Sequence, residues 1–70
     1  MDKHPIARYR RARGYTQAEL AGHVGVHRNT VAGWENGRRP YATHIPKLAE
    51  VLAIDALELV TQITDWKDSN

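Results

Sequence analysis

Two neighbouring polar residues, Arg28 and Asn29, lie at the start of a predicted short helix and can both read the edges of DNA bases. Arginine can donate two hydrogen bonds to O6 and N7 of guanine, and asparagine can pair with N6 and N7 of adenine, each with about 1–3 kcal/mol of discrimination. Ala32 and Gly33 follow on the same outward-facing side. These four residues are our candidates for base contacts.

The segment that must position them, residues 17–36, has the pattern of two short helices joined by a tight turn. Apolar or small residues recur at the spacing that two crossed helices need to pack on a third body. They are Leu20, Ala21, Val24, Val26, Val31 and Trp34. Gly25 supplies the left-handed backbone that the turn requires. The pattern predicts a helix-turn-helix, and it places Trp34 in the core rather than against a base.

Capping signals predict further helices on both sides of this unit. Pro5 suits the first turn of a helix that ends before Gly14. Thr16 and Glu19 have the spacing of a capping box, which predicts the start of the next helix. Gly37 is expected to end the helix that carries Arg28.

The carboxyl-terminal half predicts two more helices. Pro46 is tolerated only in the first turn, so Thr43 or His44 is the expected cap of the fourth helix. Asp55 is the expected cap of the fifth, which continues to about residue 66 and leaves a polar tail at about 67–70. We therefore expect an all-α fold, a compact five-helix bundle, in one domain over residues 1–70.

Composition excludes several classes of protein. The 70 residues contain no cysteine, so no disulfide framework or thiolate metal site is expected. The chain starts Met-Asp-Lys-His-Pro, without the apolar run of a signal peptide, and has no membrane-spanning stretch. The four histidines complete no metal-ligand set, and no catalytic constellation is present. We expect a soluble cytoplasmic protein with no enzymatic activity, cofactor, metal or small-molecule ligand.

Charge is distributed unevenly along the chain. Residues 1–41 hold eight of the ten Lys and Arg residues and three acidic residues, a net charge of +5, whereas residues 42–70 carry −3. Two solvated surfaces of opposite sign would explain this bias. The location of the cations around the predicted helix-turn-helix favours binding to phosphates instead.

The chain resembles the lambdoid phage repressors and Cro proteins and the wider xenobiotic-response-element-like (XRE) regulators. The resemblance covers nearly the whole chain and rests on the order and spacing of short motifs. These are Ile6, Arg10 to Gly14, Tyr15-Thr16-Gln17-Ala18-Glu19-Leu20-Ala21, Val24-Gly25-Val26, Trp34-Glu35-Asn36-Gly37, Leu48-Ala49 and Leu59. It implies a lambda-repressor-like fold in which the third helix reads bases in the major groove.

The resemblance also suggests which residues hold the DNA backbone. The residue matching Gln17 lies at the DNA backbone in the family, and the residues matching Arg10 and Glu35 form a structural ion pair. The full set of predicted phosphate contacts is Thr16, Gln17, His27, Thr30, Asn36, Arg38 and Arg39. For Thr16 a capping role comes first, and a solvated loop remains an alternative for each residue after the third helix.

Two positions depart from the family pattern. His27 stands where a Ser or Thr cap is usual, which predicts a weaker cap and leaves a phosphate contact as its alternative role. Gly33 stands where a base-reading side chain is frequent. Either the second half of the recognition helix reads little, or the missing side chain allows a close backbone approach with Ala32 at a thymine methyl group.

The fifth helix carries more apolar surface than one face against a small core needs. A homodimer could bury the surplus, as small family members dimerise in this region. The interface candidates are Leu57, Val60, Ile63 and Trp66, although Trp66 could instead fold back over its own core.

We therefore predict a prokaryotic or phage transcriptional regulator that binds a pseudo-palindromic duplex operator as a homodimer and acts as a repressor. The alternative is an antitoxin or protein-interaction module that acts through its acidic, apolar carboxyl end.

Overall fold

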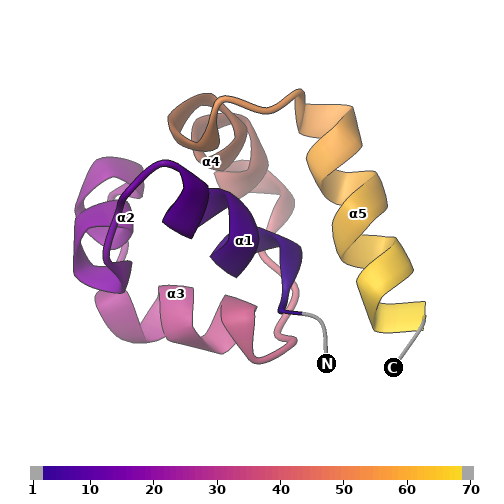
Figure 1. Cartoon of the computed structure of the whole chain (residues 1–70), viewed down its shortest axis with the longest axis horizontal. Coiled ribbons are helices and arrows are strands. Elements are labelled where there is room, and N and C mark those ends of the chain that lie inside the picture. The colour runs from indigo at the N-terminus through magenta and orange to yellow at the C-terminus, as the bar shows by residue number, and fades with distance from the viewer. Residues whose placement is uncertain (1–2, 69–70) are drawn as a thin grey trace.

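The computed structural model describes residues 3–68, which form five α-helices and one 3₁₀ turn (Figure 1). The elements are α1 (Pro5–Ala12), α2 (Gln17–Val24), α3 (Arg28–Glu35), the 3₁₀ turn η1 (Ala42–His44), α4 (Ile45–Leu52) and α5 (Ala56–Asp68). The expected all-helical, five-helix fold is confirmed. Because α5 extends to Asp68, part of the predicted polar tail is helical, and residues 69–70 lie outside the described chain.

Side-chain caps explain where the amino-terminal helices begin. Pro5 occupies the first turn of α1, as predicted, and the His4 Nδ1 atom accepts a hydrogen bond from the Ile6 amide at 3.1 Å. The predicted capping box begins α2, since Thr16 Oγ1 accepts from the Glu19 amide and Glu19 Oε1 accepts from the Thr16 amide. Each satisfied amide removes one unpaired donor from a helix end.

The start of α4 differs in detail from the prediction. His44 is the N-cap residue and Pro46 lies in the first turn, but no side chain caps this helix. Thr43 lies in η1, where the His44 amide donates to the Tyr41 carbonyl oxygen at 2.9 Å. A short turn of 3₁₀ helix therefore leads into α4 in place of a side-chain cap.

Left-handed residues end α2 and α4. Gly25 ends α2 with φ +89°, as the predicted turn requires, and its amide donates to the Ala21 carbonyl oxygen. Ala53 ends α4 with φ +58°, a conformation that disfavours residues with a Cβ atom. The Ile54 amide closes this end of the helix by donating to Ala49.

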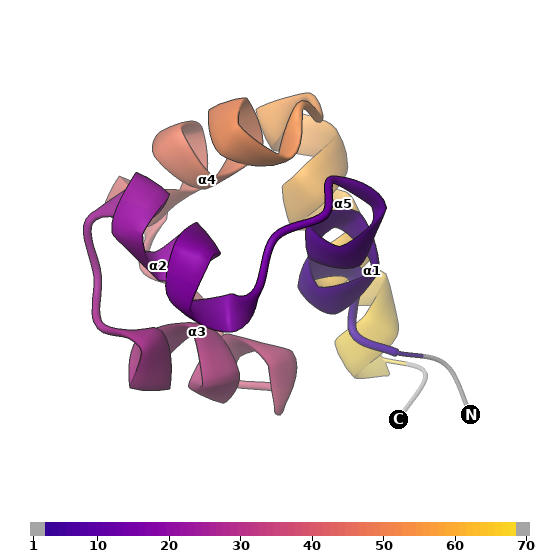
Figure 2. The same ribbon diagram turned by 60° about the vertical axis from the view of Figure 1, so that its left-hand side comes forward.

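The core is formed where all five helices meet. α2 packs against α3 and α4, α1 packs against α3 and α5, and α4 packs against α5, which the two ribbon views also show (Figure 2). The buried apolar cluster contains Ile6, Leu20, Ala21, Val31, Trp34, Leu48, Ala49, Leu52, Leu59 and Ile63. Trp34 is therefore a core residue, as predicted. α3 lies at one edge of the bundle with α2 beside it (Figure 2), so one side of α3 faces away from the core.

α5 contributes to this core more fully than its sequence suggested. Ile63, a candidate for a dimer interface, is only 5% exposed and packs inside its own chain, which corrects that assignment. The Trp66 ring lies edge-on to the His4 ring, with centroids 4.7 Å apart. Trp66 therefore folds back over its own domain, which was the alternative role considered for it. Leu57 and Val60 remain exposed, at 74% and 37%.

Candidate nucleic-acid interface

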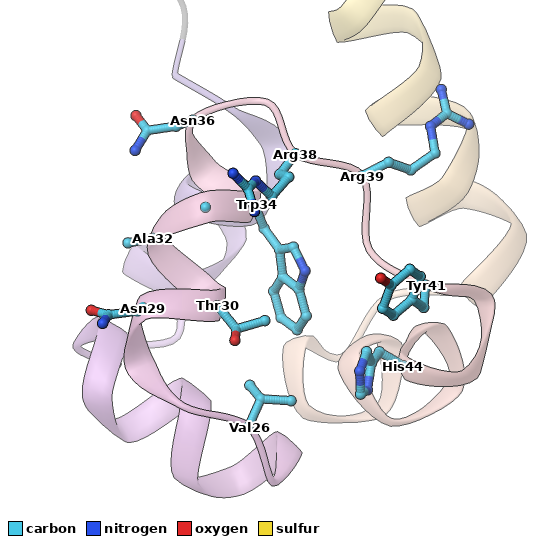
Figure 3. Close-up of a pocket in the computed structure, with 11 residues that line it drawn as sticks. Val26, Asn29, Thr30, Ala32, Trp34, Asn36, Arg38, Arg39, Tyr41 and His44 are labelled. Carbon is cyan, nitrogen blue, oxygen red and sulfur yellow. The ribbon is translucent and has the colours of Figure 1, made fainter.

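The outward side of α3 carries the predicted base-reading residues. Arg28 and Asn29 are both exposed, and no hydrogen bond or ion pair within the described chain uses their side chains. Asn29, Ala32 and Asn36 project from the same side of α3, away from the core (Figure 3). Their spacing of three and four residues places them on one helical face. Polar groups on this face are therefore available to an external partner.

His27 caps α3 with a ring nitrogen. His27 Nδ1 accepts a hydrogen bond from the Asn29 amide at 3.0 Å, so histidine takes the role of the usual hydroxyl residue. A neutral imidazole that accepts at Nδ1 carries its proton on Nε2. The exposed His27 ring therefore caps the helix with one nitrogen and presents a donor on the other.

Arg10 and Glu35 form a bidentate ion pair between α1 and α3. Arg10 Nε lies 2.6 Å from Glu35 Oε2, and Arg10 Nη2 lies 3.1 Å from Glu35 Oε1. The third arginine nitrogen, Nη1, donates to the Tyr15 carbonyl oxygen at 2.9 Å. The two side chains are only about a tenth exposed. All three guanidinium nitrogens of Arg10 donate to groups inside the protein. Arg10 therefore holds together α1, α3 and the loop between α1 and α2.

Gln17, a predicted phosphate contact, also takes part in this network. Its Nε2 atom donates to Glu35 Oε1 at 3.0 Å, which leaves one amide hydrogen for another acceptor. Burial raises the pKa of Glu35, but the hydrogen bonds from Arg10 and Gln17 and the charges of Arg10 and Arg11 outweigh it, so the pKa lies below its usual value. The carboxylate therefore stays ionised and fixes the Gln17 side chain at the start of α2.

A groove runs between α3 and the segment that follows it. It encloses about 1150 Å³ and is lined from α3 and its flanks by Val26, Asn29, Thr30, Ala32, Gly33, Trp34 and Asn36. The other wall consists of Arg38, Arg39, Tyr41 and His44 (Figure 3). Four of the predicted phosphate and base contacts on α3 and three beyond its end thus share one concave surface.

The two adjacent arginines after α3 lie on different sides of this segment. Arg38 packs on α3 at Gly33, where its Cδ atom is 3.5 Å from the position of a methyl group on residue 33. Arg39 also borders a smaller apolar pocket formed with Pro40, Ala42, Ile45, Val60 and Ile63, on the side of α5. The sequence alone treated Arg38 and Arg39 as equivalent, and the structure separates them.

Tyr41 and His44 were missed in the sequence analysis. Tyr41 is 77% exposed, and its ring stacks on that of His44 with centroids 6.3 Å apart. Both rings face the groove opposite Thr30 (Figure 3). The signal that could have found Tyr41 is an exposed aromatic residue directly after the basic Arg-Arg-Pro sequence.

A comparison with protein families matches residues 6–59 to the family described as helix-turn-helix. The chain belongs to this family. It is the XRE and lambda-repressor-like family that the sequence resembles, and this helix-turn-helix protein is therefore a DNA-binding transcriptional regulator. Comparisons with curated proteins and with solved structures gave no match.

No group of three His, Cys, Asp or Glu side chains that could hold a metal ion occurs among residues 3–66, whose side chains the structure describes. Within the same residues, each helix is too short or too polar to cross a membrane.

Proposed function

We propose that this regulator reads a specific duplex operator by placing α3 in the major groove. The observation that supports the proposal most is the exposed position of Arg28 and Asn29 at the first turn of α3, next to a cap and an ion pair that fix the helix. A preorganised helix loses less conformational entropy when it binds. Arg28 would then donate to guanine and Asn29 would pair with adenine.

The flanking donors would hold the DNA backbone on both sides of α3. On one side lie the Thr16 hydroxyl, which already accepts from Glu19 and keeps its own proton, and the remaining amide hydrogen of Gln17. His27 Nε2 provides a donor at the amino end of α3. Thr30 in the first turn of α3, and Asn36 and Arg39 beyond its far end, line the groove. Such contacts set the orientation of the protein and are independent of sequence.

We also propose that the regulator binds as a homodimer through the exposed part of α5. Leu57 and Val60 are three residues apart on one face, and Val60 borders the apolar pocket with Pro40, Ala42 and Ile45. Two copies related by a two-fold axis would present two α3 helices about 34 Å apart, the spacing of successive major grooves. A pseudo-palindromic operator would follow from this arrangement, and repression by promoter occlusion is part of the same proposal.

The decisive experiment selects duplexes from a random pool and then measures affinity for the selected site, for scrambled DNA and for single-base variants. Arg28→Ala is expected to weaken the selected site by about 1–3 kcal/mol and to remove the preference at one base pair. Arg39→Ala is expected to weaken selected and scrambled DNA alike and to lower the salt slope by about 1. A uniform loss at every sequence in both variants would contradict the assignment of Arg28 to base reading.

The second candidate function, a protein-interaction module, is favoured only by the acidic carboxyl half and the exposed Leu57. Salt distinguishes the two functions. Binding through phosphates weakens steeply between about 50 and 200 mM salt, with a slope set by the number of contacts. Duplex affinity that is weak and insensitive to salt would favour the interaction module.

A further inference from the structure

The missing side chain of Gly33 leaves room that the Arg38 side chain occupies. A methyl group on residue 33 would lie 3.5 Å from Arg38 Cδ and 3.9 Å from both Arg38 Cβ and Nε. These are ordinary contact distances for one methyl group. A longer side chain would extend into the space that the arginine stem now fills. Gly33 and Arg38 thus form one packed unit, although they are five residues apart.

The backbone at the end of α3 directs Arg38 back over the helix. The Arg38 amide donates to the Gly33 carbonyl oxygen at 2.9 Å, and the Gly37 amide donates to Trp34 at 3.0 Å. Gly37 has φ +106°, a region that disfavours other residues, so it allows this reversal. Behind the turn, Trp66 Cζ3 lies 3.5 Å from the position of a methyl group on Gly37. The start of the Arg38 side chain is therefore fixed by the fold.

The charged end of Arg38 is uncommitted within the described chain. No hydrogen bond or ion pair with the side chains of residues 3–66 uses its guanidinium, whereas all three nitrogens of Arg10 have partners. Arg38 is exposed and lines the same groove as Asn29 and Asn36. Figure 3 shows the Arg38 side chain beside α3, and its Nε atom lies 3.9 Å from the position of a methyl group on Gly33.

Position 33 lies one turn after Asn29 on the same face of α3, because residues four apart on a helix are neighbours. The arginine that covers position 33 therefore extends the face that begins with Arg28 and Asn29. Its stem rests against the helix, which reduces the entropy lost when the guanidinium is fixed on a partner. A guanidinium held here has the two parallel donors that match O6 and N7 of guanine.

We propose that Arg38 is a sequence-reading residue, which reaches over Gly33 and donates to a guanine beyond the base pair contacted by Asn29. The proposal rests on the proposed function, since it requires α3 in the major groove. It gives the small residue at position 33 a role, which is to admit an arginine from outside the helix to the outward face of α3. It also removes Arg38 from the set of residues that only contact phosphate.

The first test compares Arg38→Ala with Arg39→Ala, which removes the same charge from the next residue. Both variants and the unmodified chain are titrated against the selected operator and its single-base variants at one salt concentration. Arg38→Ala is expected to lose roughly 5- to 150-fold in affinity for the selected site and to lose the preference at one G·C pair. Arg39→Ala is expected to retain that preference. Uniform weakening of all sites by Arg38→Ala would assign Arg38 to phosphate and overturn the proposal.

The second test changes Gly33 and leaves Arg38 in the sequence. Gly33→Ala is expected to retain the same base preference, because one methyl group fits at 3.5 Å from Arg38 Cδ. Gly33→Leu is expected to displace the arginine and remove the preference, and adding Arg38→Ala is expected to cause little further loss. Circular dichroism and thermal melting verify that each variant is folded. Retention of the preference by folded Gly33→Leu would overturn the proposal.

Duplex selection with the unmodified chain distinguishes failure of this inference from failure of the proposed function. If the chain selects no preferred duplex at any salt concentration, the proposed function and this inference both fail. If it selects a site whose recognition depends on Arg28 and not on Arg38, the function stands and the inference alone is overturned.

Discussion

Breaking the ion pair between Arg10 and Glu35 is expected to destabilise the fold strongly. Glu35→Gln keeps the size of the side chain but leaves the Arg10 charge without its partner at a site where both side chains are only about a tenth exposed. Glu35 accepts three hydrogen bonds, two from Arg10 and one from Gln17. Removing one member of a buried pair costs about 3–5 kcal/mol, and the remaining exposure favours the lower end, about 3 kcal/mol.

This loss is large relative to the stability of so small a domain. At about 0.05–0.15 kcal/mol per residue, a chain of this length has roughly 4–10 kcal/mol of stability in total. One kcal/mol corresponds to about 4–8 °C in Tm for a domain of this size, so Glu35→Gln is expected to lower Tm by roughly 12–24 °C. Thermal melting and urea denaturation followed by circular dichroism measure both quantities.

An exposed ion pair provides the matched control. Lys47 and Glu50 lie 3.3 Å apart in α4, with side chains 55% and 71% exposed. The same chemical change, Glu50→Gln, is expected to alter the free energy of unfolding by less than about 0.5 kcal/mol, because exposed pairs contribute little. Equal effects of Glu35→Gln and Glu50→Gln would refute the argument from burial.

A double-mutant cycle separates the pair from other effects of each substitution. Arg10→Met removes the unpaired charge, so Arg10→Met with Glu35→Gln is expected to cost less than the sum of the two single variants. Strict additivity would mean that the two side chains do not stabilise each other.

Glu35→Gln is also expected to affect DNA binding, because Glu35 accepts a hydrogen bond from Gln17. Binding to all DNA sequences is expected to weaken alike, and filter binding on scrambled duplex measures this loss.

Two further changes test other features of the fold. Ala53→Gly is expected to stabilise the protein by about 0.5–1 kcal/mol, because Ala53 is exposed and has φ +58°. As the control, Ala12→Gly at an ordinary helical position is expected to destabilise the protein by a similar amount. Urea titration measures both changes. The pKa of His4 is lowered, mainly because the ring is buried. The charge of Glu35 raises this pKa and that of Arg8 lowers it further. Folding therefore favours the neutral ring that caps α1. The unfolded chain therefore binds a proton first as pH falls below about 6.5, and stability is expected to decrease from there down through the folded-state pKa. Urea denaturation at pH 7, 6 and 5 measures this decrease. Between pH 7 and pH 5 the His4→Asn variant is expected to lose less stability than the unmodified chain does. Identical pH profiles of the two proteins would contradict the prediction.

The sequence by itself determined the elements whose chemistry is local. Thr16 and Glu19 begin α2 because each satisfies an amide only three residues away, and Gly25 ends it because the turn needs a left-handed residue. The family resemblance, carried by ordered motifs over most of the chain, indicated the pairing of Arg10 with Glu35. The sequence left the role of His27 open, and the structure shows that its ring nitrogen accepts the bond that a hydroxyl usually does.

Only the tertiary structure decided how groups distant in sequence share space. It turned Ile63 into the core and left Leu57 exposed. Both residues are apolar, so residue type alone does not decide which of them faces the core. The tertiary structure also placed Arg38 on Gly33 and Arg39 toward α5, although the two residues are identical and adjacent. Side-chain direction after a helix depends on the backbone reversal, which Gly37 allows, and on what packs behind it, which residue type does not reveal.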